Sequence, residues 1–113
     1  MSYMSLNDNK YIGTLKDDPQ LTKSIQGKSL CRFTIVCERK DMPGIKDYIP
    51  CLAIGKIAEN IVRNLRKGSF LYIQGQNQSY TKTIEGTIIH GTEIYVKDVI
   101  FLNQPKEGGS YEK

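Results

Sequence analysis

The sequence predicts an all-β fold with one helix: a five-stranded Greek-key barrel in which the helix lies between the third and fourth strands. Three observations lead to this prediction. The run from Leu30 to Glu38 alternates in the manner of a half-buried strand. The stretch from Asp47 to Gly75 has the pattern of a strand, a short helix and a second strand, with few residues left for the connections between them. The other β-rich runs are separated by Gly, Pro and Asp residues, which favour turns.

Length, charge and hydropathy limit the class of protein. The 113 residues make one domain, and 16 basic against 12 acidic residues give a net charge of +4, which mildly favours a polyanionic partner. No apolar run approaches the roughly 20 residues that a membrane-spanning helix requires. Residues 1–10 are polar and lack the apolar core of a signal peptide. We therefore expect a cytoplasmic protein with no membrane partner.

The sequence gives little support to metal, disulfide or catalytic chemistry. The three cysteines, Cys31, Cys37 and Cys51, form no Cys-x-x-Cys motif, and His90 is the only histidine. We therefore expect buried free thiols and no zinc or other cofactor. His90 also has no serine or cysteine partner at a recognisable spacing, so we expect no enzyme.

The first strand is expected from Tyr11 to Leu15, after a partly ordered lead-in over residues 1–10. Gly13 interrupts this strand, which indicates a bend, a bulge or the close approach of another backbone. The Asp17-Asp18-Pro19 run favours a turn, because the proline restricts its own backbone and that of the residue before it. The segment from Leu21 to Lys28 is expected to be a loop or ribbon.

The second and third strands are expected from Leu30 to Glu38 and from Tyr48 to Ile54, joined by a charged hairpin loop from Arg39 to Lys46. One side of the second strand should carry Cys31, Phe33, Ile35 and Cys37, and the other Arg32, Thr34, Val36 and Glu38. One side of the third strand should carry Tyr48, Pro50, Leu52 and Ile54. One face of each strand is thus expected to pack, and the other to meet solvent or a ligand.

The helix is expected from Lys56 to Lys67, where apolar residues recur at helical spacing. Its apolar stripe consists of Ile57, Ala58, Ile61, Val62 and Leu65. Arg66 and Lys67 should lie in the last turn, where the helix dipole favours cations, and Gly68 should end the helix. A helix this short between two strands is expected to plug an open end of the barrel.

The fourth strand is expected from Phe70 to Gln78 and the fifth from Thr92 to Leu102, with a long, polar, projecting hairpin from Ser79 to Gly91 between them. Alternation in the fifth strand predicts two opposite sides. One should carry Ile94, Val96, Asp98 and Ile100, and the other Tyr95, Lys97, Val99 and Phe101. The domain should therefore span residues 11–103, followed by a flexible tail over residues 104–113.

The order and lengths of these elements agree with a barrel of the OB type. Several motifs, in order along the chain, also resemble bacterial single-stranded DNA-binding proteins over roughly Ile12 to Leu102. The motifs are Gly13-Thr14-Leu15-Lys16-Asp17-Asp18-Pro19, Phe33-Thr34-Ile35, Gly55-Lys56-Ile57-Ala58-Glu59, Leu65-Arg66-Lys67-Gly68-Ser69 and Tyr72-Ile73-Gln74-Gly75-Gln76.

The resemblance implies a homotetramer, or a dimer, that coats single-stranded DNA during replication, repair or recombination, in the cytoplasm and on the nucleoid. It implies no catalysis. Aromatic rings stack on bases of any identity, and Lys and Arg neutralise phosphates. The family often ends in an acidic, apolar tip, whereas this chain reads Ser110-Tyr111-Glu112-Lys113 at its end. Recruitment of replication and repair enzymes by that route is therefore not expected.

Carried onto this chain, the resemblance assigns a base-stacking role first to Tyr48, at the start of the third strand. Lys56 matches a lysine that follows a glycine in the family, and it is expected to contact phosphate. Ile54 stands where the family often has an aromatic residue, so it keeps an apolar contact at most. Tyr80 and Lys82 lie in the hairpin where the family has a late aromatic and a basic residue.

The remaining expected contacts are less closely tied to a motif. Arg39 and Lys40 keep positive charge on the loop after the second strand, although the aromatic residue common there in the family is missing. Arg32 projects from the second strand and is expected to contact phosphate. Tyr72 either stacks on DNA or fills the barrel wall or a contact between subunits.

Two other interpretations remain open at this point. One is a primosome accessory protein, which shares the fold and also lacks the acidic tip, although its helix is usually degenerate and the Lys56 to Lys67 segment is intact here. The other is an OB domain that serves as a protein-interaction adaptor, with Leu52, Ile54 and Phe70 as its contact surface.

Overall fold

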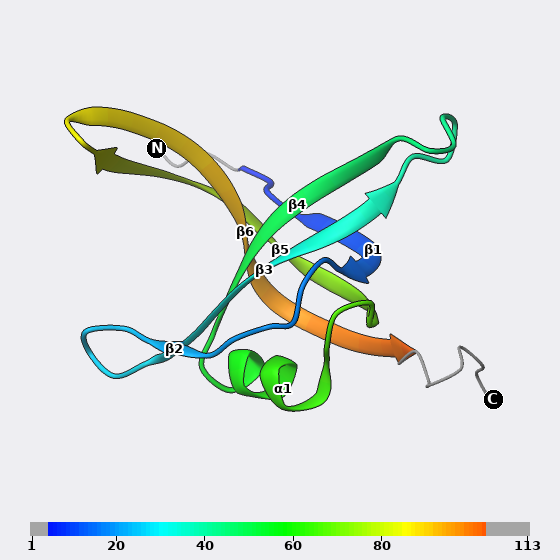
Figure 1. Cartoon of the computed structure of the whole chain (residues 1–113), viewed down its shortest axis with the longest axis horizontal. Coiled ribbons are helices and arrows are strands. Elements are labelled where there is room, and N and C mark those ends of the chain that lie inside the picture. The colour runs from blue at the N-terminus through cyan, green and yellow to red at the C-terminus, as the bar shows by residue number, and fades with distance from the viewer. Residues whose placement is uncertain (1–4, 104–113) are drawn as a thin grey trace.

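Six strands and one helix make up residues 5–103, the part of the chain that the computed structural model describes (Figure 1). In chain order they are β1 (Asn9–Leu15), β2 (Thr22–Lys23), β3 (Ser29–Glu38), β4 (Lys46–Ile54), α1 (Lys56–Asn64), β5 (Phe70–Ile84) and β6 (Thr87–Asn103). β2 is a two-residue strand that pairs with the start of β3, so the predicted loop or ribbon is a short ribbon. The predicted tail, residues 104–113, lies outside the described residues.

The five long strands close into a barrel. They hydrogen-bond in the order β1-β5-β6-β4-β3, and β1 also pairs with β3, where Thr14 faces Val36. β4 and β6 run parallel where Cys51 faces Ile94. The other pairings are antiparallel. The predicted five-stranded barrel with a helix between its third and fourth long strands is confirmed.

β1 begins two residues earlier than predicted, at Asn9, so the end of the expected lead-in is part of the barrel. Backbone pairing with β5 explains this extension, because Asn9 lies opposite Gly75. Gly13 lies where β3 crosses closely, and a Cβ on Gly13 would meet the Val36 carbonyl oxygen. The close approach that Gly13 indicated is confirmed.

The barrel core follows the predicted alternation of β3 and β4. Cys31, Phe33 and Ile35 are buried, whereas Arg32 between them is exposed. The buried apolar residues are Leu15, Cys31, Phe33, Ile35, Cys51, Ala53, Ala58, Ile61, Leu65, Leu71, Ile73, Ile94 and Val96. The described structure therefore has one continuous core inside the barrel wall.

All three cysteines are free, as predicted, but only two of them are buried. Burial raises the pKa of the Cys51 thiol to about 12, so this side chain is a neutral, apolar part of the core at physiological pH. Cys37 is half-buried because β3 leaves the barrel near that residue, and its thiol donates to the Ile12 carbonyl (3.4 Å). The prediction of a buried thiol is wrong for Cys37.

α1 covers one end of the barrel (Figure 1) and buries Ala58 and Ile61 against it. The helix ends at Asn64, so the prediction that it continues to Lys67 is wrong. Leu65 is extended, and Gly68 (φ +88°) lies in a following turn. Contacts with β1 and its loop cause this early end, because the Lys67 N–H donates to the Asp18 carboxylate (2.7 Å) and the next N–H to the Leu15 carbonyl.

β5 and β6 continue beyond the barrel as a projecting two-stranded ribbon (Figure 1). The ribbon turns at Glu85 and Gly86, whose φ angles of +50° and +80° are typical of a two-residue hairpin turn. The predicted projecting hairpin is confirmed. Its strands, however, run without interruption past the predicted ends at Gln78 and Thr92.

A β-bulge changes which side of β6 faces the core. Gln74 pairs with Asp98, and the next residue of β5, Gly75, pairs with Val96. Lys97 therefore has no partner and is the extra residue of the bulge. Val96 is buried, but beyond the bulge Val99 and Phe101 pack against the core. The predicted alternation, which grouped Val96 with Asp98 and Ile100, is therefore wrong after Val96.

Membrane insertion through a helix has no candidate among residues 5–103. The helix there, Lys56–Asn64, has nine residues, and no described helix has the length and apolar character needed to cross a bilayer.

Candidate nucleic-acid interface

A groove of about 690 Å³ lies between the outer side of β3 and β4 and the ribbon of β5 and β6. We call it the groove; its lining residues include Arg32, Thr34, Pro50, Tyr80, Lys82 and Glu93, and Asp17 and Asp18 at one end. Its floor consists of outward-facing residues of two paired strands, in which Thr34 lies opposite Pro50. Its wall is the ribbon, which the β6 to β4 pairing holds against the floor. Three of the predicted contacts, Arg32, Tyr80 and Lys82, thus come together.

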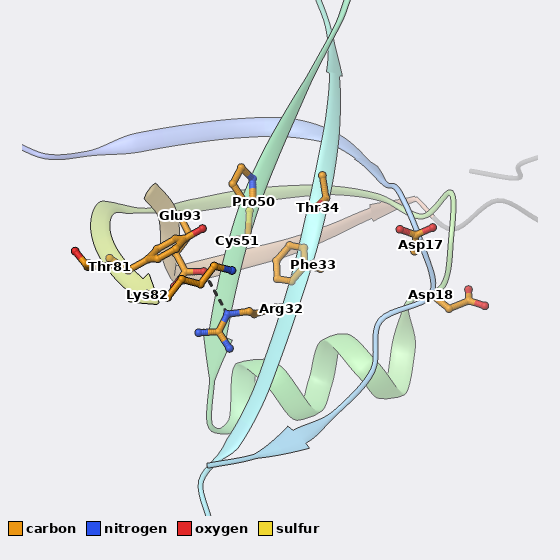
Figure 2. A pocket seen from close by; sticks show the side chains of 11 residues that line it. Asp17, Asp18, Arg32, Phe33, Thr34, Pro50, Cys51, Thr81, Lys82 and Glu93 are labelled. Atoms are coloured by element: carbon orange, nitrogen blue, oxygen red, sulfur yellow. Dashed lines mark hydrogen bonds and ion pairs between the residues drawn. The ribbon is translucent and has the colours of Figure 1, made fainter. Parts of the chain in front are cut away.

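The positively charged side chains of the groove gather at its ribbon end. Figure 2 shows Arg32, Lys82 and Glu93 on that side. The Lys82 ammonium lies 5.7 Å from the centre of the Tyr80 ring, a cation–π distance. The Arg32 Nε donates to Glu93 (3.4 Å), whose side chain is 15% exposed.

Carboxylates also line the groove, at its other end. Figure 2 shows Asp17 and Asp18 there, on the segment that follows β1. Asp17 forms an ion pair with Lys16 (3.3 Å), and Asp18 accepts the Lys67 N–H. The groove is therefore of mixed charge rather than uniformly basic, and the charges of opposite sign are separated along it.

Tyr48 lies on the same outer side of β4 as the groove floor. It faces Val36 across the strand pair and is two residues from Pro50. Its side chain is 54% exposed, so the ring does not enter the core. An exposed ring of this kind is accessible to a base.

Ile54 and Lys56 continue this line of side chains toward the helix. Ile54 faces Leu30 on β3 and is half-buried, while Lys56 is the exposed first residue of α1. Gly55 separates the two with a backbone conformation (φ +78°, ψ −138°) that favours glycine. Three predicted site residues, Tyr48, Ile54 and Lys56, thus lie along β4 and its continuation.

Arg39 and Lys40 lie at the β3–β4 hairpin. The Arg39 guanidinium donates two hydrogen bonds of 3.0 Å to the Asp47 carboxylate, and these bonds hold the pKa of Asp47 below its usual value. Lys40 is exposed. The charge of Arg39 is thus already compensated within the chain, which the sequence interpretation missed because the two residues are eight positions apart.

Tyr72 lies on a different side of the barrel. Its neighbours in register are Ile12 on β1 and Ile100 on β6, and these two side chains are about half exposed. We call this side the apolar face and define it by Ile12, Phe70, Tyr72, Ile100 and Leu102. The structure therefore does not bring Tyr72 together with the groove.

Two groove features were missed in the sequence. Glu93 is 61 positions from Arg32, so no local pattern indicates their pairing. Gly91 lies opposite Tyr80, and a Cβ on Gly91 would come within 2.6 Å of ring carbon Cζ. The Tyr80 ring thus rests on the glycine, a packing that only the strand register reveals.

A closed five-stranded barrel with a helix at one end and a groove on its outer side is the architecture of OB-fold proteins. The family model of the single-strand binding protein family matches residues 6–102, and the chain belongs to that family.

Three relatives illustrate this similarity. The chain is 31% identical over 109 residues to single-stranded DNA-binding protein A of Bacillus subtilis (strain 168), covering 92% of this chain and 63% of that protein. It is 31% identical to single-stranded DNA-binding protein 1 of Clostridium acetobutylicum, covering 90% and 98%. Single-stranded DNA-binding protein 3 of Listeria innocua is 33% identical, covering 86% and 64%. The chain thus spans less than two thirds of two of these relatives.

Proposed function

We propose that this protein binds single-stranded DNA without strong sequence preference and protects it during replication, repair or recombination. Its family and the names of its relatives support this function. Its action is binding, not catalysis. The proposal includes a cytoplasmic location, with the protein associated with the nucleoid.

The observation that carries the proposal is an exposed aromatic ring beside a groove that contains cations. Tyr48 offers an open ring face, and Arg32 and Lys82 supply positive charge on the neighbouring surface. Stacking is worth about 1–3 kcal/mol per base and accepts any base. Phosphate contacts add an attraction that weakens as the salt concentration rises. We propose that Tyr48, Ile54 and Lys56 continue the binding surface along β4.

Glu93 limits how strongly this surface attracts a polyanion. A phosphate that contacts Arg32 must compete with the Glu93 carboxylate, which lies 3.4 Å from the guanidinium nitrogen. A partly exposed ion pair of this kind is worth only about 0–1 kcal/mol, so a phosphate can replace it. Arg39 has the same competition from Asp47, whereas Lys40 and Lys56 add exposed positive charge.

The apolar face is proposed to contact other copies of this chain. It presents Ile12, Tyr72 and Ile100 in one row across three strands, and neighbouring Phe70 and Leu102 are also exposed. A second copy offers an identical apolar row, so a two-fold contact would cover both rows at once. We propose a homotetramer, with a dimer as the smaller assembly. Tyr72 would then contact a neighbouring subunit rather than DNA.

The direct test is a titration of tyrosine fluorescence with oligo(dT). The chain has seven tyrosines and no tryptophan, so tyrosine dominates the emission. Saturable quenching with an affinity that falls steeply as salt rises would support the proposal. Absence of quenching, or binding that salt does not change, would contradict it and favour an adaptor that binds protein. A duplex of the same length serves as the control and should compete weakly.

A further inference from the structure

One side of the β5–β6 ribbon continues the groove beyond its defined residues. In an antiparallel ribbon, every second cross-strand pair projects to the same side. The successive pairs on the groove side are Lys82 with Ile89, Tyr80 with Gly91, Gln78 with Glu93 and Gln76 with Tyr95. Because Tyr80 and Glu93 line the groove, Tyr95 projects on that same side, one pair further toward the barrel.

Tyr95 also lies in a row that crosses the floor of the groove. Arg32 on β3 faces Leu52 on β4, and Leu52 faces Tyr95 on β6. The inward-facing neighbours of Tyr95, Ile94 and Val96, are buried, so the tyrosine side chain lies on the outer wall. The ring is thus two strands away from a groove cation, on a surface continuous with it.

A lysine accompanies this tyrosine as it does Tyr80. The Lys97 ammonium lies 4.9 Å from the centre of the Tyr95 ring, and the Lys82 ammonium lies 5.7 Å from that of Tyr80. Both pairs have the spacing Tyr-x-Lys. Lys97 is the extra residue of the bulge and has no partner residue on β5. Its long, flexible side chain is exposed to solvent.

We propose that Tyr95 and Lys97 form a second nucleotide subsite for single-stranded nucleic acid, in which the ring stacks on a base and the ammonium contacts the adjoining phosphate. This inference rests on the proposed function and extends it to residues that the family resemblance did not indicate. In the free protein the ammonium covers the ring. On binding it moves to the phosphate, and the base replaces it on the ring face, because stacking of a base outweighs an exposed cation–π contact.

The subsite lies far enough from Tyr80 for oligonucleotide length to matter. The Tyr80 ring packs on Gly91 of β6. Gly91 is four residues from Tyr95 along that strand, so the two positions are about 13 Å apart. A dinucleotide therefore occupies one ring or the other, whereas a longer strand reaches both. The contribution of Tyr95 should grow with the length of the strand.

The experiment compares the wild-type chain with Tyr95→Ala and Tyr95→Phe, using a thymidine dinucleotide as the short strand and oligo(dT) of about 16 nucleotides, the upper end of the usual range for one OB domain, as the long one. Tyr95→Ala should weaken binding of the long oligonucleotide about 5- to 150-fold and leave that of the short one nearly unchanged. Tyr95→Phe keeps the ring and should bind as the wild type does. An equal loss at both lengths, or no loss at either, would overturn the inference.

Lys97→Gln provides a second measurement that leaves the half-buried tyrosine in place. The slope of log affinity against log salt should fall by about 0.7, the value for one phosphate contact on a single strand. Lys28→Gln, in the exposed turn before β3, is the matched control and should leave the slope unchanged. Equal slopes for Lys97→Gln and wild type would contradict the subsite even if Tyr95→Ala failed to fold.

Failure of this inference differs from failure of the proposed function. If wild-type protein binds oligo(dT) and the variants at Tyr95 and Lys97 bind equally well, the second subsite is wrong and the proposed function stands. If wild-type protein binds neither oligonucleotide, the proposed function itself is wrong, and the subsite with it.

Discussion

The groove and the apolar face share strands β5 and β6, yet their chemistry is opposite. The groove side presents Tyr80, Lys82 and Glu93, a mixture of ring and charge. The apolar face presents Tyr72 and Ile100, with no charged side chain between them in the strand register. The same two strands thus supply two surfaces. One suits a charged, flexible ligand, and the other suits a second copy of the chain.

The bulge at Lys97 keeps both surfaces on the outer side of β6. Before it, odd-numbered residues such as Tyr95 project outward, and after it even-numbered residues such as Ile100 do so. Without the extra residue, β6 could not keep Val96 and Phe101 both directed at the core. Gly75 accommodates the bulge, because a Cβ there would meet the Tyr95 carbonyl oxygen. The inserted residue therefore keeps β6 in phase with β5, and the two surfaces occupy different lengths of the same outward side.

The largest expected effect comes from a charge on the apolar face. Ile100→Asp should convert the assembly to single chains, because a carboxylate buried in a contact between copies is uncompensated. Sedimentation of the free protein measures this change, and circular dichroism checks the fold. The side chain is about half exposed in one chain, so folding should survive. An unchanged assembly would place the contact elsewhere, and a wild-type monomer would contradict the proposed oligomer.

The next effect comes from the groove side. Tyr48→Ala removes an exposed ring and should weaken oligo(dT) binding by about 1–3 kcal/mol while leaving the assembly intact. Tyr72→Ala is the matched variant on the apolar face. It should leave the binding of a short oligonucleotide nearly unchanged and weaken the assembly. If the two variants exchanged these phenotypes, the assignment of the two faces would be reversed.

A smaller effect, of opposite sign, is expected from Glu93→Gln. Removing this carboxylate frees Arg32 and should tighten binding by roughly 1 kcal/mol or less. Asp98→Asn on the same strand, beyond the bulge, removes the same charge away from the groove and should change affinity less. Weaker binding by Glu93→Gln would mean that the carboxylate positions Arg32 rather than competing for it.

The smallest effects are expected from two exposed ion pairs, one near each face. Hydrogen bonds from Gln74 and Lys10 lower the pKa of Asp8, and those from Arg39 lower the pKa of Asp47. A lowered folded-state pKa stabilises the protein above the unfolded value and loses that effect as pH falls through the folded value.

The thermal stability of Asp8→Asn and Asp47→Asn should therefore lie slightly below that of the wild type at pH 7. The difference should shrink as pH falls below about 4, where the unfolded carboxyl begins to protonate. Thermal unfolding followed by circular dichroism at pH 7 and pH 3 measures it. A difference that grows toward low pH would show that these carboxylates do not stabilise the fold through their charged form.

The sequence predicted the barrel because its strongest signals are local. Alternation over β3 grouped Phe33 with Ile35 on one face, which is the buried one. Two-residue periodicity grouped Tyr48 with Pro50 on one side of β4, which is the outer side in the structure. The register of these strands then follows from burial of one face, since a slip of one residue would expose the core residues. The same logic found the helix that plugs the barrel.

What the sequence did not predict depends on distant contacts. The end of α1 at Asn64 is set by hydrogen bonds from the following turn to Asp18 and Leu15, which lie about 50 positions earlier. The bulge depends on the partner strand. The Tyr95–Lys97 subsite left a weak signal, the repeated Tyr-x-Lys spacing, but alternation alone assigned the two residues no ligand. The pairing of Arg32 with Glu93 left no signal in the sequence, because the two residues are 61 positions apart.

The central claim is that a single strand of DNA lies on the β3–β4 side and the ribbon, and leaves the apolar face free. Mapping of backbone amide shifts in nuclear magnetic resonance spectra, with oligo(dT) added stepwise, tests it most directly. We expect shifts at Arg32, Tyr48, Tyr80 and Glu93 and little change at Ile12. Shifts centred on Ile12, Tyr72 and Ile100, with the groove unaffected, would contradict it.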